Sequence, residues 1–159
     1  MSLNDSIGRL GESYVATALH MPVKGKFLFK VTPLGEKYEV FDFMVNLLDD
    51  TRLPFGPFFM LQVKTKSSAL SEASLNVSFT LEEVVASGER KVPAYLAGVE
   101  AIGRKQSGFF LAIDRRRTTG IYSISRKFDL SDEDVLERLY REVAGFFSMV
   151  DNEFESVFI

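Results

Sequence analysis

Charged and polar side chains interrupt two short apolar segments of this sequence, residues 41–45 and 59–64. A carboxylate or an ammonium group inside such a segment is costly to desolvate unless it is paired or binds a metal ion. Successive side chains of a strand point to opposite faces, so Gln62 and Lys64 share one face. If the two segments are neighbouring strands, Asp42 converges with them on one polar spot. This convergence predicts a metal site.

Helices and strands in the first half of the chain must position this spot. Asn4 or Asp5 is a suitable N-cap for a first helix that we expect to end near residue 19. Glu12 lies at the edge of the apolar stripe of this helix. Alternation of apolar and polar residues, bounded by turn residues, predicts strands at residues 26–31, 40–48, 58–66 and 75–79.

The second half of the chain predicts two more helices and three strands. Thr80, with Glu83 three residues later, indicates a capping box for a helix at residues 81–87. Short turns between the strands expected at residues 94–102, 108–114 and 120–125 predict an antiparallel meander. Ser131 is the expected cap of a last, acidic helix at about residues 131–150. We therefore expect one α/β (α+β) domain over residues 1–159, with a mixed central sheet flanked by helices.

The composition excludes several classes of protein. With no Cys and one His, thiolate metal sites and Cys nucleophiles are absent, and a Ser-His-Asp hydrolase is hard to assemble. There is no phosphate-binding P-loop and no dinucleotide fingerprint. No apolar run reaches the ~18 residues of a membrane helix, and the N-terminus lacks a signal-peptide pattern. We therefore expect a cytoplasmic location and no membrane partner.

The net charge of −3 conceals an asymmetry along the chain. Residues 129–159 carry 2 basic and 9 acidic residues, whereas residues 1–128 carry 17 basic and 13 acidic ones. The body of the protein is therefore mildly basic once the acidic C-terminal segment is set aside. A mild excess of this kind is compatible with a nucleic-acid partner without indicating one.

The order of the polar groups resembles the restriction-endonuclease-like superfamily of PD-(D/E)xK nucleases, and more narrowly its DUF4365 group. That order is a Glu on a first helix, an Asp in a second strand and Gln-x-Lys in a third. The matching segments are Gly11-Glu12, Phe41-Asp42-Phe43 and Leu61-Gln62-Val63-Lys64-Thr65-Lys66. Residues 110–114 and 121–124 resemble the closing strands of the group. The resemblance spans roughly residues 7–125 and implies a restriction-endonuclease-like mixed sheet flanked by helices.

This resemblance implies a metal-dependent nuclease that hydrolyses phosphodiester bonds in DNA, with RNA as the less favoured substrate. The implied cofactor is Mg²⁺ or Mn²⁺, which activates water and stabilises developing negative charge. Lys64 is expected to orient or deprotonate that water, or to offset phosphate charge. The implied catalytic residues are Glu12, Asp42, Gln62 and Lys64. The implied metal ligands are Glu12, Asp42, Gln62 and the backbone carbonyl of Val63.

One residue departs from the pattern, because the superfamily more commonly carries Asp or Glu at the position of Gln62. A neutral amide removes one negative charge from the expected metal shell. The alternative function is therefore a catalytically inactive nuclease-like domain that binds nucleic acid or a protein. A homodimer and an association with a partner protein both remain open.

Basic residues near the expected turns are candidates for phosphate contacts. They are Lys66, Arg104, Lys105, Arg115, Arg116 and Arg117. The structural alternative is that the turn residues among them belong to ordinary solvated hairpins.

Each candidate site residue also has a structural interpretation. In this interpretation, backbone amides or Arg52 satisfy the carboxylate of Asp42. Gln62 and Lys64 then lie on the solvated face of an edge strand. Glu12 is a surface residue. The last helix is expected to pack on the domain, and the end of the chain, residues 154–159, is available to a protein partner.

Overall fold

The computed structural model describes residues 2–36, 38, 40–67, 73–149 and 153–159. These residues form three helices and two sheets, a five-stranded mixed sheet and a two-stranded one, which confirms the predicted mixed α/β class. No helix among the described residues has both the length and the apolar character needed to cross a membrane. In chain order the elements are α1 (Leu3–His20), β1 (Phe29–Pro33), β2 (Phe43–Leu48), β3 (Pro54–Lys66), β4 (Ser74–Phe79), α2 (Leu81–Gly88), β5 (Ala94–Ile102), β6 (Lys105–Ala112), β7 (Ile121–Ser125) and α3 (Glu133–Ser148).

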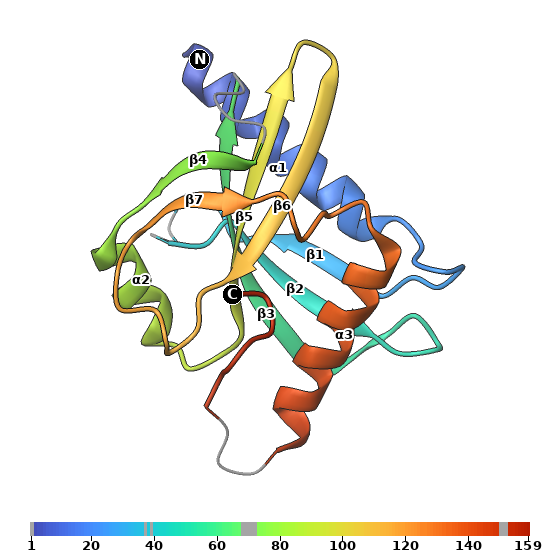
Figure 1. The fold of residues 1–159 in the computed structure, drawn as a ribbon. Helices are drawn as coiled ribbons and strands as arrows, with labels where there is room; N and C mark the ends of the chain where they lie inside the picture. Colours follow the sequence, from blue (N-terminus) through green and yellow to red (C-terminus); the bar gives the residue numbers. More distant parts are fainter. Residues whose placement is uncertain (1, 37, 39, 68–72, 150–152) are drawn as a thin grey trace.

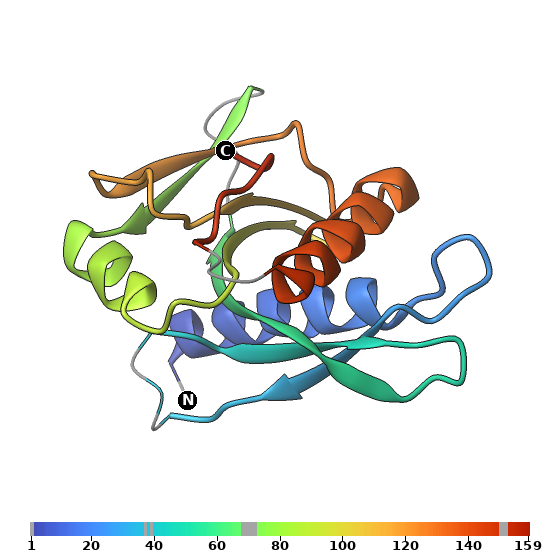
Figure 2. The same cartoon turned by 90° about the horizontal axis from the view of Figure 1, so that it is seen from below.

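The large sheet has the strand order β1-β2-β3-β5-β6, and its one parallel pair is β3 with β5 (Figure 1). The connection between these two strands passes through β4 and α2, as a parallel pair requires. Strands β4 and β7 form the small antiparallel sheet. The large sheet curves around α1, with α3 beside that helix, while β4, β7 and α2 lie on the other side (Figure 2).

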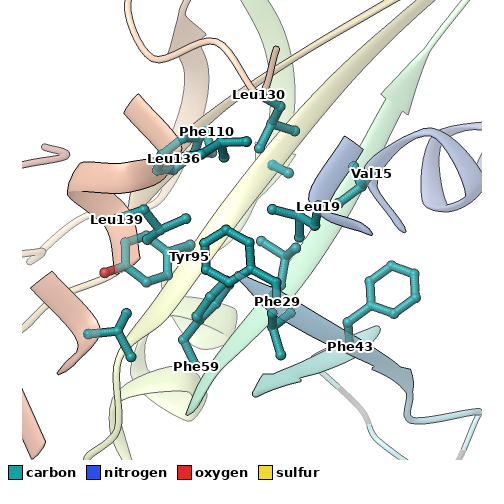
Figure 3. Packing of buried hydrophobic residues seen from close by; sticks show 14 of the residues in the cluster. Val15, Leu19, Phe29, Phe43, Phe59, Tyr95, Phe110, Leu130, Leu136 and Leu139 are labelled. Atoms are coloured by element: carbon teal, nitrogen blue, oxygen red, sulfur yellow. The ribbon is translucent and has the colours of Figure 1, made fainter. Parts of the chain in front are cut away.

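Two apolar clusters fill the two sides of the large sheet. The first joins α1 and α3 to the sheet through side chains that include Leu19, Phe59 and Leu139 (Figure 3). At its centre the Tyr95 ring lies edge-on to the Phe59 ring, with 5.2 Å between the ring centroids. The second cluster joins β4, β7 and α2 to the opposite face of the sheet. Because β5 is covered on both faces, eight of its nine residues are buried.

The predicted meander of three strands is wrong. Strand β6 pairs with β5 as expected, but β7 leaves the large sheet and pairs with β4. Ile121 and Ile124 of β7 pack into the second cluster beside residues of β4. The edge of β6 is instead covered by later segments, since Phe110 N–H donates to Phe128 O at 3.0 Å.

Helix starts follow local side-chain chemistry. Helix α1 begins at Leu3, earlier than predicted, because Ser2 is its N-cap and forms a capping box with Asp5. The predicted capping box of Thr80 and Glu83 is confirmed at α2. Helix α3 is capped by Asp132 rather than by Ser131, because the Asp132 carboxylate accepts from two N–H groups of the first turn. The expected last residue of this helix, 150, lies outside the described residues.

Strand boundaries differ from the prediction mainly at strand starts. Strand β1 begins at Phe29 rather than at residue 26, and β6 begins at Lys105 rather than at residue 108. Strand β3 begins at Pro54, in the segment predicted as a loop, because β2 and β3 are joined by a long hairpin. Gly56 in this hairpin has a φ of 119°, a backbone conformation that favours glycine.

The end of the chain packs against its own domain through alternate residues. Phe154 and Phe158 are buried in the first cluster, and Ser156 between them is buried as well. Ala112 N–H donates to Phe158 O at 2.5 Å, which extends the backbone pairing at the edge of β6. The Glu142 carboxylate of α3 accepts from Val157 N–H at 2.7 Å. These contacts fix the C-terminal segment onto the sheet.

Candidate active site

Asp42 lies just before β2 and not inside it, which corrects the sequence prediction. Phe41 packs in the second apolar cluster and Phe43 in the first, so the chain bends between them. Asp42 N–H donates to Leu61 O at 3.0 Å. Its carboxylate Oδ2 accepts from Val63 N–H at 2.7 Å. The Asp42 side chain thus takes the place of a backbone partner where β2 and β3 separate.

Gln62 and Val63 lie on β3 beside this carboxylate. Gln62 Nε2 is 3.3 Å from the carbonyl oxygen of Val63. Within a strand, the N–H and C=O of one residue point to the same side, so the Val63 carbonyl is on the Asp42 side of β3. An amide group, a backbone carbonyl and a carboxylate therefore meet at the end of the β2–β3 ladder.

Lys64 points to the face of β3 that is covered by β4 and α2. Its Nζ is 3.3 Å from Glu83 Oε1 and 5.9 Å from the centroid of the Phe79 ring. Burial raises the pKa of the Asp42 carboxyl group, and the charge of Lys64 opposes this rise. The expected edge-strand explanation does not hold, because β3 is paired on both sides, with β2 and β5.

Glu12 approaches Asp42 from α1, on the opposite face of the sheet. Its neighbour Gly11 is buried against β3, where a Cβ would lie 1.8 Å from Thr65 Oγ1. The missing side chain lets α1 pack closely on the strand, and this brings Glu12 over its end. Glu12 and Asp42 line the same open groove of about 710 Å³. The two carboxylates therefore face one solvent-accessible space.

Gly11→Ala is expected to lower the free energy of unfolding by about 1–2 kcal/mol, because the added methyl overpacks the contact with Thr65. The matched control is Gly8→Ala, one turn earlier, where nothing lies within 4 Å of the added Cβ. That control should gain up to about 1 kcal/mol from helix propensity. Urea denaturation of both variants measures this difference, and a stabilised Gly11→Ala protein would contradict the close packing of α1 on β3.

The pKa values of the two carboxyl groups are both raised, and a bound cation would favour their charged forms. Burial raises the pKa of Asp42, against the opposing effects of the Val63 N–H hydrogen bond and the Lys64 charge. Burial also raises the pKa of Glu12, and the Asp42 charge adds to this, while Arg9 opposes it. Two carboxylates that are both disfavoured by desolvation, one also by repulsion from the other, are a suitable pair for a divalent cation.

The donor groups fit a hard cation such as Mg²⁺ or Mn²⁺. These ions prefer oxygen ligands, and Mg²⁺ usually keeps several waters and binds one or two carboxylates. Asp42 has a second carboxylate oxygen beyond the one bound to Val63 N–H. Glu12, the Val63 carbonyl and the Gln62 amide oxygen are the other candidate donors. Among the described residues, no group of three or more His, Asp or Glu side chains is placed to hold a metal ion, so any ion here relies on backbone oxygen and water.

Three of the basic residues predicted to bind nucleic acid lie at the end of β3 and at the β5–β6 hairpin. They lie further along the sheet than Leu61 and Val63, which pair with Tyr95 and Ala97 near the start of β5. Lys66 is the last residue of β3, and it is paired in register with Glu100 of β5. Arg104 and Lys105 are exposed at the tip of the β5–β6 hairpin. Figure 1 shows this hairpin and the arrowhead of β3 at one end of the molecule.

The three consecutive arginines lie elsewhere. Arg115 forms ion pairs with Glu153 and Glu155, and Arg116 pairs with Asp114 and reaches Ser156 O. Arg117 Nε donates to Ala112 O at 3.1 Å. Arg115 and Arg116 hold the C-terminal segment at the end of β6, a strand separated from β2 by β3 and β5. Their contact with nucleic acid stays a prediction, and it would require them to exchange these partners.

Sequence reasoning did not identify Glu83 as a partner of a candidate site residue. The sequence signal identifies it only as a capping residue, and it fills that role, since Glu83 Oε2 accepts from Thr80 N–H at 2.7 Å. Its contact with Lys64 joins residues 19 positions apart on two elements. No periodicity in the sequence relates such a pair. Arg52, the other predicted partner of Asp42, instead lies over the Phe27 ring.

The structure thus brings Glu12 and Asp42 to one groove and places Val63 and Gln62 beside Asp42. Lys64 instead points to the face of β3 that is covered by β4 and α2, where it pairs with Glu83. No family model matches the chain, and no curated protein sequence matches it. What this site does must therefore follow from its own chemistry.

Proposed function

We propose that this protein is a metal-dependent nuclease of the restriction-endonuclease-like type that hydrolyses phosphodiester bonds, in DNA rather than RNA. The observation that supports this most is the pair Glu12 and Asp42 at one open groove, with Lys64 close enough to act electrostatically on Asp42. Phosphodiester hydrolysis needs a bound cation, an activated water and a positive charge near the phosphate. These groups supply each of them.

Each residue has a definite role in this proposal. Asp42 and Glu12 hold the cation, and the Val63 carbonyl and the Gln62 amide oxygen complete its protein ligands. The bound cation lowers the pKa of water and offsets charge on the phosphate. Lys64 reaches the same point from the other face of β3 and orients the attacking water or binds a phosphate oxygen. Lys66, Arg104 and Lys105 extend the contact along the backbone of the nucleic acid.

A cleavage assay on single-stranded and duplex DNA and RNA, with Mg²⁺ or Mn²⁺, tests this proposal. The wild type is expected to cut DNA faster than RNA and to lose activity with a chelator. Lys64→Ala is expected to be inactive, whereas Lys30→Ala, an exposed lysine of β1, keeps full activity. Equal cleavage by the wild type and Lys64→Ala would indicate a contaminant or a wrong site.

The second candidate function is a catalytically inactive module of the same fold that binds nucleic acid or a protein. Gln62 favours it, because the amide group lies against the Val63 carbonyl and brings no charge to the site. A homodimer or a partner protein, in the cytoplasm, is compatible with either function.

Gln62→Glu distinguishes the two functions. A third carboxylate is expected to strengthen Mn²⁺ binding by about 10-fold or more, since each ligand charge adds to the attraction for a hard cation. An active wild type that keeps or raises its cleavage rate in Gln62→Glu supports the enzyme. Cleavage that is seen only in the variant identifies the wild type as the inactive module. Calorimetric Mn²⁺ titration and the cleavage assay give the two readouts.

A further inference from the structure

Glu83 connects the start of α2 to Lys64. One oxygen of its carboxylate, Oε2, accepts from Thr80 N–H at 2.7 Å, and the other, Oε1, lies 3.3 Å from Lys64 Nζ. Glu83 N–H in turn donates to Thr80 Oγ1 at 3.3 Å. The carboxylate is therefore shared between a helix cap and a lysine of the neighbouring strand.

The helix cap makes this ion pair more than an ordinary surface contact. An exposed ion pair is weak partly because two long side chains must be held in one geometry. Here the cap already fixes the Glu83 carboxylate, so that only Lys64 loses freedom when the pair forms. About two thirds of each side chain is covered, with 29% of Lys64 and 31% of Glu83 exposed. Solvent therefore screens the pair less than it screens a fully exposed one.

Lys64 has a long, flexible side chain and few other groups to hold it. The Phe79 ring is 5.9 Å from Nζ, near the limit of a cation–π contact. The charge of Asp42 attracts Lys64. In the described part of the chain, however, Lys64 forms its ion pair with Glu83. Among the described residues, Glu83 is thus the charged group that is paired with the ammonium group.

We propose that Glu83 is a positioning residue of the active site, which holds the Lys64 ammonium group in one place on the face of β3 that is covered by β4 and α2. The catalytic consequence of this inference rests on the proposed function. The positioning of Lys64 by Glu83 does not depend on that function. Helix α2, which contributes no ligand, thereby becomes part of the active site. Loss of Glu83 frees the lysine side chain without removing it.

The positioning is tested by the mobility of Lys64, measured by NMR relaxation of its side chain in the full-length protein. In Glu83→Gln the amide oxygen can still accept from Thr80 N–H, while the charge that holds Lys64 is lost. We expect Lys64 to be ordered in the wild type and as mobile as the exposed Lys30 in this variant. The matched control is Thr80→Ala, which removes the hydroxyl of the cap and leaves the Glu83 carboxylate in place. In this control Lys64 is expected to stay ordered, although the melting temperature falls.

Two results of this experiment would overturn the inference. One is an ordered Lys64 in Glu83→Gln, and the other is an equally mobile Lys64 in Thr80→Ala, which would assign the effect to the helix cap alone. The catalytic consequence is read separately. Glu83→Gln should lower kcat by about 10-fold or more with little change in KM, as loss of an orienting partner does, and an unchanged kcat would contradict it. If the wild type neither binds Mn²⁺ nor cleaves, the proposed function fails, and the relaxation data still decide whether Glu83 positions Lys64.

Discussion

Asp42→Asn is expected to reduce metal-dependent cleavage by about 10²–10³-fold or more, because it removes the central negative charge of the site. The variant should fold normally. Asparagine keeps an oxygen that can accept from Val63 N–H, the hydrogen bond that now measures 2.7 Å. The substitution also relieves the cost of burying a carboxylate, which raises the pKa of Asp42 in the native protein. Single-turnover rates with saturating Mn²⁺ measure the effect.

The control for this variant is Asp50→Asn, which makes the same chemical change at a side chain that is 91% exposed and does not line the groove. It should cleave at the wild-type rate. If both variants lose activity equally, overall charge rather than the site is responsible. If neither loses activity, Asp42 has only the structural role of accepting from Val63 N–H, and the nuclease proposal is wrong.

Phe158→Ala is expected to lower the free energy of unfolding by about 3–5 kcal/mol, the usual loss when a fully buried aromatic side chain is truncated. Phe158 has no exposed surface, and its ring lies 5.0 Å from the centroids of both Phe110 and Phe128. Its removal leaves a cavity at the edge of β6 and weakens the attachment of the C-terminal segment. Urea denaturation followed by circular dichroism gives the difference in free energy.

The neighbouring Ile159 provides the matched comparison, because it is 60% exposed. Ile159→Ala should change the free energy of unfolding by less than about 0.5 kcal/mol. Similar small effects for both variants would mean that the C-terminal segment contributes little to the core. Because β3, β5 and β6 lie between this segment and β2, Phe158→Ala should leave kcat unchanged at temperatures where the protein stays folded.

Local patterns predicted the secondary structure well where one physical effect dominates. The capping box at Thr80 and Glu83 determines the start of α2, and β5 occupies the predicted residues 94–102 because its apolar run is long and bounded by turn residues. Pairing between strands was harder to predict. Residues 108–113 are apolar without alternation, so the sequence does not show which strand follows β6 in the sheet. Long-range packing of Ile121 and Ile124 on β4 decides that β7 joins a second sheet.

The candidate site was predicted in part. Strand alternation predicted that Asp42 converges with Gln62 and Lys64 if the two strands are neighbours, and the structure places β2 beside β3. The bend at Asp42 was missed, because the apolar residues on both sides of it suggest a continuous strand. The close approach of α1 to β3 at Gly11 was not predicted either. A glycine within a helix gives no sequence signal of the element that it packs against. The packing of the C-terminal segment on Tyr95 and Phe110 was not predicted, because these contacts are entirely long-range.

Calorimetric titration with Mn²⁺ over a range of pH tests the central claim most directly, that Glu12 and Asp42 together bind a divalent cation. Protons compete with the metal ion for both carboxylates, and the pKa of each is raised by burial. The wild type is expected to bind a single Mn²⁺ ion, with an affinity that keeps increasing above the usual carboxyl range of about pH 4–5. Binding should disappear in Asp42→Asn and persist in Asp50→Asn. Absence of binding in the wild type at every pH, or unchanged binding in Asp42→Asn, would contradict the account.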